Sequence, residues 1–312
     1  MERRKIIIDT DPGQDDAVAL LLALASPELE VLAITCVAGN VPLALTSLNA
    51  RKICDLAGRR DVRVAAGAAA PLSRALVTAE EVHGRTGLDG PDLPPPETPL
   101  DPAAGVDVIV DLLAGAGPGE ITLCALGPLT NIALALRQAG DARAAIREIV
   151  LMGGGCFEGG NTTPAAEFNI YVDPEAAAEV FASDLPLTVL PLDLTHKCLT
   201  TGARLAAIRA LDTPVAEAVV AMLAFFERHD EAKYGTDGGP LHDPNVIAWL
   251  LRPELYSGRK INVEIETGSD LTRGMTVADW WGVTDRPANA TWLRDVDADG
   301  FFALLTERLR DL

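Results

Sequence analysis

Four aspartates lie within eight consecutive positions near the start of the chain, in the sequence DTDPGQDDA: Asp9, Asp11, Asp15 and Asp16. The first two follow the apolar run of residues 6–8, which is typical of a buried strand, and the last two begin a helical stretch. The Pro12-Gly13 pair between them favours a turn, so the carboxylates can converge on one point. Clustered carboxylates repel one another unless a cation lies among them, and oxygen ligands of this kind suit Ca²⁺ or Mg²⁺.

Two other interpretations of this cluster are open at this point. Aspartates at the start of a helix cap free N–H groups and complement the helix dipole, which accounts for one or two of the four but not for the pair on the strand side. Asp9-Thr10-Asp11 also matches the two acids of haloacid dehalogenase-type phosphatases, which would make Asp9 a nucleophile beside Mg²⁺. That pattern has Thr or Val where Gly13 stands, and it lacks the Asp15-Asp16 pair.

Strand-like and helical segments alternate over the first two thirds of the chain. The expected strands are 5–8, 31–37, 62–66, 121–126, 148–152 and 187–192, and the expected helices are 16–25, 43–56, 106–114, 129–137 and 174–182. Helices at 214–228, 244–251 and 299–310 and strands at 260–266, 275–278 and 290–292 complete the prediction. The pattern predicts one α/β domain over residues 1–312, with a mainly parallel open sheet flanked by helices. Ligands of such sheets bind outside the carboxyl ends of the strands, where the aspartates fall.

Composition excludes several classes of partner. The chain has 26 basic and 45 acidic residues, hence a formal charge of 26 − 45 = −19, so neither nucleic acid nor an anionic membrane surface is expected to bind.

No apolar run reaches the roughly 18 residues of a membrane span, and the apolar part of the N-terminus is too short for a signal peptide. The five widely spaced cysteines favour reduced thiols. A cytoplasmic protein is therefore expected.

The DTDPGQDDA segment resembles the N-terminal signature of the inosine–uridine preferring nucleoside hydrolases. Further matches follow in the order that the family has them: Gly39-Asn40, HGRTGLDG at 83–90, GPLTN at 127–131, Met152-Gly153-Gly154, Asn161, Glu167-Phe168-Asn169, His242-Asp243-Pro244 and RGMT at 273–276. The resemblance implies a Rossmann-like nucleoside hydrolase fold and an enzyme of purine and pyrimidine salvage. Such an enzyme hydrolyses the N-glycosidic bond of a ribonucleoside to free base and ribose. It also implies a homodimer or homotetramer.

The same resemblance implies a Ca²⁺ site and a ribose site. Asp11, Asp16 and Asp243 would bind the ion through carboxylates and Leu126 through its backbone carbonyl, and Asp11 would also be the general base for a metal-activated water that attacks C1′. The residues expected to bind or pack against the ribose are Asp15, Asn40, Met152, Asn161, Glu167 and Asn169. For the asparagines, a role in a turn is the alternative. A non-catalytic sugar-binding protein on the same fold is a further alternative.

The base end of the site is expected to hold histidines and aromatic residues. His242 precedes a ligand and is the candidate to protonate the leaving base, and His83 lies in a loop that could contact the base. Phe168, Phe226 and Tyr234 could stack on the base, and Trp280 and Trp281 are candidates for a tryptophan in the pocket. His196 follows a strand end with a weaker expectation, and His229 fits a helix terminus. Asp230 stands where pyrimidine-preferring members usually have Gln, which leaves base preference undecided.

Overall fold

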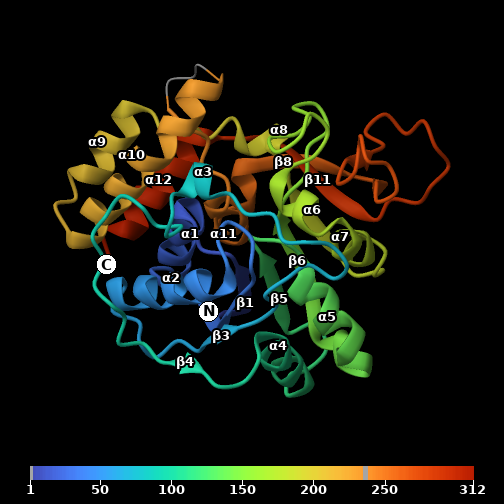
Figure 1. Ribbon diagram of the computed structural model, residues 1–312, viewed down its shortest axis with the longest axis horizontal. Coiled ribbons are helices and arrows are strands. Elements are labelled where there is room, and N and C mark those ends of the chain that lie inside the picture. The colour runs from blue at the N-terminus through green and yellow to red at the C-terminus, as the bar shows by residue number, and fades with distance from the viewer. Residues whose placement is uncertain (1–2, 235–237) are drawn as a thin grey trace.

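A nine-stranded sheet forms the centre of the computed structural model, which describes residues 3–234 and 238–312; the side chains of residues 229–234 lie outside the description (Figure 1). The strand order is β4-β3-β2-β1-β5-β6-β7-β11-β8. Its strands are β1 (Arg4–Thr10), β2 (Leu29–Cys36), β3 (Val64–Ala66), β4 (Leu100–Asp101), β5 (Ile121–Ala125), β6 (Ile146–Met152), β7 (Leu187–Leu190), β8 (Tyr256–Ile261) and β11 (Ala290–Val296). Neighbouring strands from β4 to β11 are parallel, and β8 pairs antiparallel with β11.

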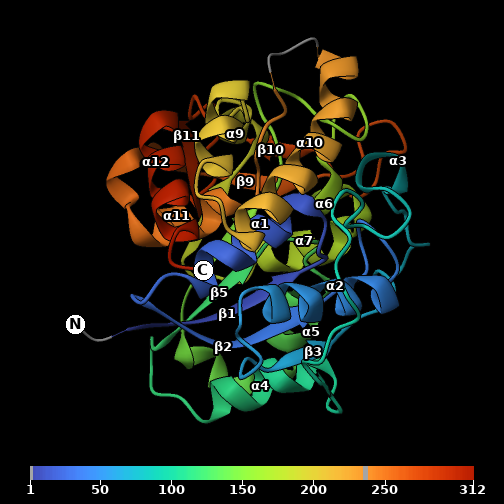
Figure 2. The same cartoon turned by 90° about the vertical axis from the view of Figure 1, so that its left-hand side faces the viewer.

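Helices cover both faces of the sheet (Figure 2). The helices are α1 (Gln14–Leu24), α2 (Leu43–Leu56), α3 (Glu80–His83), α4 (Gly105–Ala114), α5 (Thr130–Ala139), α6 (Phe168–Val172), α7 (Pro174–Phe181), α8 (Leu192–Thr195), α9 (Gly202–Arg209), α10 (Pro214–Tyr234), α11 (Pro244–Leu251) and α12 (Ala298–Leu309). The first core lies between the sheet and α1, α2 and α9 to α12, and the second lies between the sheet and α4, α5 and α7.

The two cores explain the apolar run of β1. Ile6 and Ile8 are buried in the first core, and Ile7, which points to the opposite face, is buried in the second. A strand covered on both faces needs no polar alternation, because successive side chains enter different apolar layers. The same run therefore fixes β1 in the middle of the sheet and places its carboxyl end, Asp9 to Asp11, inside the molecule.

The predicted fold class is confirmed, and the α/β fold is built from one large, mostly parallel sheet. One predicted element is wrong. Residues 260–266 form the end of β8 and, after Asn262, β9 (Val263–Ile265), which pairs with β10 (Thr276–Ala278) in a separate two-stranded sheet. Asn289 holds this junction, since its side chain accepts from Val263 N and donates to Val263 O, at 2.8 and 2.9 Å. Local sequence cannot predict this change of partner, because it depends on residues more than twenty positions away.

The cysteines and the helices give two further observations. All five cysteines are unpaired, and four are buried. Among the residues described, no helix is long and apolar enough to cross a membrane.

Candidate active site

A cavity of about 310 Å³ opens at the carboxyl ends of the central strands. Its lining comes from sequence segments far apart, since Asp15 lies on α1, Asn40 follows β2, Met152 ends β6 and Asp243 directly precedes α11. This is the position where open parallel sheets bind their ligands. The cavity is large enough for a small molecule but not for a polymer.

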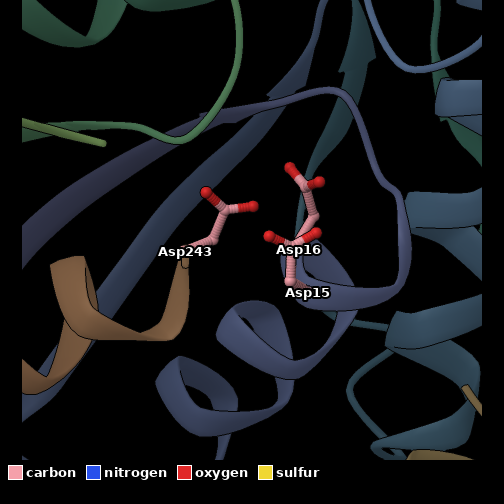
Figure 3. Close-up of side chains that lie close together, drawn as sticks. All are labelled: Asp15, Asp16 and Asp243. Atoms are coloured by element: carbon pink, nitrogen blue, oxygen red, sulfur yellow. The ribbon is translucent and has the colours of Figure 1, made fainter. Parts of the chain in front are cut away.

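Three buried carboxylates lie close together, and two of them, Asp15 and Asp243, line the cavity (Figure 3). Asp15 and Asp16 lie in the first turn of α1 and Asp243 precedes the first turn of α11, and one oxygen of each lies within 4.8 Å of the others. Asp15 was expected as a ribose binder, and the structure places it with the group that can hold a metal ion. Asp11, the remaining carboxylate that was expected to bind the ion, lies outside this group but close to it, since the charges of Asp16 and Asp15 act on its carboxyl.

Asp16 is held in place by the turn that precedes α1. One of its oxygens accepts from Gly13 N at 3.0 Å and from Asn40 Nδ2 at 3.1 Å, and the other accepts from Asp11 N at 3.3 Å and from the Thr10 hydroxyl. Gly13 has no room for a side chain, because an added Cβ would lie 2.3 Å from Nδ1 of His83. The capping role considered for the helix-side aspartates is therefore real for Asp16 and does not exclude a second role.

Asp11 has one carboxylate oxygen bound and one unpaired. Its Oδ2 accepts from Asn40 N at 2.7 Å, whereas its Oδ1 is buried and has no hydrogen-bond partner among the described residues. Gly127 makes room for this carboxylate, since a Cβ there would lie 2.2 Å from Oδ1. A buried carboxylate oxygen without a donor is costly unless a cation or a bound water approaches it.

Burial and mutual repulsion shift the titration of this cluster. The pKa values of Asp11, Asp16 and Asp243 are raised, first because burial disfavours the charged form, and for Asp11 and Asp243 also because neighbouring carboxylates repel the charge. A divalent cation among these oxygens would remove the penalty and keep the carboxylates ionised. The all-oxygen donor set thus fits a hard metal ion such as Ca²⁺ or Mg²⁺.

Asp9, the first aspartate of the motif, makes hydrogen bonds that hold the ends of neighbouring strands together. Its Oδ1 accepts from Nδ2 of Asn131 at 2.8 Å and from the Thr35 hydroxyl, and burial raises its pKa to about 7. Asn131, in the GPLTN motif, also donates to the carbonyl of Cys36 at 3.0 Å. These contacts join the carboxyl ends of β1 and β2 to the start of α5. Oδ1 of Asp9 is therefore occupied by hydrogen bonds that support the fold.

The loop between β6 and α6 brings polar groups to the opposite wall of the cavity. Glu167 accepts from Asn169 N and Gly154 N, both at 2.9 Å, and from Ile170 N at 3.2 Å; burial raises its pKa to about 7. Asn161 accepts from Phe168 N at 2.9 Å, which orders the loop that carries both residues. Asn161, Glu167, Phe168 and Asn169 all line the cavity, so the structure brings together these four residues expected from the sequence to bind substrate.

Leu126 and Met152 also line the cavity, and Asn169 connects them. Nδ2 of Asn169 donates to the carbonyl of Leu126 at 2.7 Å and to that of Met152 at 3.3 Å. The Leu126 carbonyl, expected as a metal ligand, is thus directed toward the cavity wall and has a hydrogen-bond donor beside it. Its role as a ligand stays a prediction.

Histidine and phenylalanine rings form the remaining wall. His83 lies at the end of α3 with Nδ1 2.8 Å from Oε1 of Gln14, and its ring is 5.4 Å from that of Phe226. His242 lies 6.5 Å from Phe226, edge to face, and 5.7 Å from His196. Burial, followed by the nearby His196 and His83, lowers the pKa of His242 well below its usual range, so its ring is neutral at pH 7.

The structure adds His196 to the site and removes other candidates. His196 lines the cavity, with Nδ1 3.6 Å from a carboxylate oxygen of Glu158. Trp280 and Trp281 are absent from the described lining and stack instead with Arg259. The predictions for Tyr234, Asp230 and His229 fall on side chains outside the described residues. A strand end before Asp193-Leu-Thr-His was the sequence signal for His196, and only the fold shows that it faces His242.

Comparison with known proteins identifies the family of the chain. The family model of the inosine-uridine preferring nucleoside hydrolases matches residues 6–303. The pyrimidine-specific ribonucleoside hydrolase RihA of Photobacterium profundum is 50% identical over 98% of both chains, and an uncharacterised protein of Schizosaccharomyces pombe is 55% identical over the same shares. Among solved structures, the purine-preferring ribonucleoside hydrolase of Gardnerella vaginalis superposes with a TM-score of 0.91, at 31% identity over 98% of both chains.

Fold, site and comparisons define a hydrolase that acts on N-glycosyl compounds. The chain belongs to the inosine-uridine preferring nucleoside hydrolase family, whose reaction releases a base and ribose from a nucleoside. The alternative of a haloacid dehalogenase-type phosphatase finds no support, because residues 6–303 match another family.

Replacement of Asp243 by Asn should separate metal binding from folding. In chelator-treated protein at pH 8, the variant is expected to melt no lower than the parent, because one of the repelling carboxylates is gone. Added Ca²⁺ should raise the melting temperature of the parent, since a ligand that binds only the native state stabilises it. The variant should lose most of that rise. Asp107→Asn, on the exposed face of α4, is the control and should respond like the parent; an unchanged response of Asp243→Asn would contradict the assignment.

Proposed function

We propose that this protein is a Ca²⁺-dependent ribonucleoside hydrolase that cleaves the N-glycosidic bond with Asp11 as general base. The observation that carries the proposal is the polarity of one cavity, with carboxylates at one end and a neutral histidine among aromatic rings at the other. Asp11, Asp16, Asp243 and the Leu126 carbonyl are the proposed ligands, and we add Asp15 because its carboxylate lies close to those of Asp16 and Asp243. When bound, the ion would orient the sugar diol and acidify the attacking water.

The ribose is proposed to lie between the carboxylates and the β6–α6 loop. Asp15, Asn40, Asn161, Glu167 and Asn169 offer carboxylate and amide groups to hydroxyls, which both donate and accept hydrogen bonds. Met152 lies beside them and supplies an apolar surface. Because Glu167 and Asn169 are fixed by backbone contacts, little side-chain entropy would be lost on binding.

In the proposed reaction, Asp11 acts on the attacking water and His242 acts on the leaving base. Water gives a proton to the unpaired oxygen of Asp11 as its oxygen bonds to C1′. The C1′–N bond breaks and its electron pair leaves with the base; His242 donates a hydrogen bond to the base as negative charge develops on it, and the base takes up its proton from water. The developing positive charge on the ribose is favoured by the nearby carboxylates, by the same logic that governs O-glycoside hydrolysis.

Pyrimidine nucleosides are the proposed preferred substrates. Relatives at 47–50% identity are named as pyrimidine-specific, whereas the named purine-preferring structure is 31% identical. Asp230 in place of the usual Gln argues for a preference rather than strict specificity. Measurement of kcat/KM for uridine, cytidine, inosine, adenosine and guanosine tests this proposal, which expects the highest values for uridine and cytidine.

Asp11→Ala is expected to abolish ribose release while the fold survives, because the variant removes the base and leaves the Asp16 cap in place. A reducing-sugar assay measures the first expectation and circular dichroism the second. We expect a fall in kcat of at least about 100-fold, in line with the loss of a general base. Asp107→Asn should retain the parent rate. If Asp11→Ala keeps a kcat near that of the parent, Asp11 is not the base.

His242→Ala is expected to discriminate between leaving groups. A natural base leaves poorly unless it is neutralised, whereas p-nitrophenolate is stable as an anion. The variant should therefore lose far more rate on uridine or inosine than on p-nitrophenyl riboside. Steady-state kinetics on both substrates measure this ratio. Equal losses on the two substrates would show that His242 acts on something other than the leaving base.

We further propose a homodimer or homotetramer. Leu271, Trp281 and Val283, on the segments around β10, are 85%, 75% and 83% exposed, and Figure 1 shows this part of the chain extending from the body of the molecule. Such exposed apolar side chains are typical of a surface that another chain covers. Light scattering should give two or four times 32.9 kDa, and a mass of one chain at every concentration would contradict the proposal.

A further inference from the structure

A single buried hydrogen bond holds the ring of His242. Its Nδ1 lies 2.7 Å from the hydroxyl of Thr195, and the two residues are 9% and 0% exposed. Thr195 is the last residue of α8, a four-residue helical turn that follows β7. The contact therefore joins the turn after one strand to a residue two positions before the start of α11, 47 positions later in the sequence.

The environment of Thr195 decides which atom donates. Within the described part of the chain, Nδ1 of His242 is the hydroxyl's one hydrogen-bond partner. If Nδ1 carried the hydrogen and the hydroxyl accepted it, the buried O–H would have no acceptor, which costs about 1–3 kcal/mol. If the hydroxyl donates, this cost disappears. Nδ1 is then unprotonated, and the hydrogen of the neutral imidazole must lie on Nε2.

The turn that carries Thr195 is fixed on several sides. Thr195 N donates to the carbonyl of Pro191 at 3.1 Å. Asp193, two residues earlier, accepts from Phe157 N at 2.7 Å and from Nε1 of Trp292 at 3.1 Å. The hydroxyl is thus attached to a rigid support, and it holds the Nδ1 edge of the His242 ring, a residue that lines the cavity.

We propose that Thr195 is a positioning residue that fixes His242 as the Nε2–H tautomer, with this N–H available to the leaving base. The inference rests on the proposed function, because the base is the group that would accept the hydrogen bond. The acceptor is a ring nitrogen or carbonyl oxygen of a nucleobase, since either can take up negative charge as the glycosidic bond breaks. Without the hydroxyl, the ring can turn or adopt the Nδ1–H form, in which Nε2 donates nothing.

Thr195→Val and Thr195→Ser test the proposal as a matched pair. Val keeps the shape of Thr and removes the hydroxyl, whereas Ser keeps the hydroxyl. The Val variant should lose about tenfold in kcat on a natural nucleoside, the effect of about 1.4 kcal/mol from one hydrogen bond, with KM little changed. On p-nitrophenyl riboside it should stay within about twofold of the parent. The Ser variant should behave like the parent on both substrates.

Two-bond ¹⁵N–¹H correlation spectra of histidine-labelled protein provide a readout that needs no activity. The His242 signal, assigned by its loss in His242→Ala, should show an Nε2–H tautomer in the parent and the Ser variant and a changed tautomer pattern in the Val variant. A proton on Nδ1 in the parent would overturn the proposal, and so would equal losses of the Val variant on both substrates. If the Val variant fails to fold, the spectra of the parent and the Ser variant still show which ring nitrogen of His242 carries the hydrogen, and that decides the proposal. If the parent releases no ribose from any nucleoside, the proposed function fails while the tautomer result stands by itself.

Discussion

The burial of several carboxylates at the ends of parallel strands is the constraint on which the rest of the site depends. Ionised carboxylates in a dry environment are disfavoured by both desolvation and repulsion, and these two effects raise the pKa values of Asp11 and Asp243. Two features of the fold respond to the cost of burying these carboxylates. Backbone N–H groups and amide side chains bind the oxygens that face the sheet, as Asn40 does for Asp11 and Asp16. Oδ1 of Asp11 has no hydrogen-bond partner among the described residues, and Gly127 leaves room for it.

The chemistry then divides between the two ends of the cavity, and each end has its own scaffold. The carboxylates come from the first turn of α1, which follows β1, and from the residue before α11, and the groups proposed to bind the ribose follow β2 and β6 in the sequence. The base end is assembled from helical segments on one face, with His83 from α3, Thr195 and His196 from the α8 turn, Phe226 from α10 and His242 beside α11. Asp243 and His242 are adjacent in sequence, so one short segment joins the proposed metal site to the proposed base site.

Sequence alone predicts the parts that local patterns determine. The strand, turn and helix around the four aspartates follow from an apolar run, Pro-Gly and an acidic first turn, and the structure has them where expected. What the sequence could not predict depends on distant contacts. Asp15 joins Asp16 and Asp243 because α11 packs against α1, and Thr195 meets His242 across 47 positions. The split of residues 260–266 into two sheets is of the same kind, because Asn289 holds the junction.

The central claim is that a cation bound by these carboxylates is required for ribose release. The direct measurement is a Ca²⁺ titration of fully chelated protein, with bound metal and initial rate of uridine or inosine hydrolysis measured on the same samples. The account predicts no hydrolysis without metal and a rate that rises in proportion to bound Ca²⁺ until one ion per chain is reached. Ribose release at the full rate from protein verified to be free of metal would contradict it.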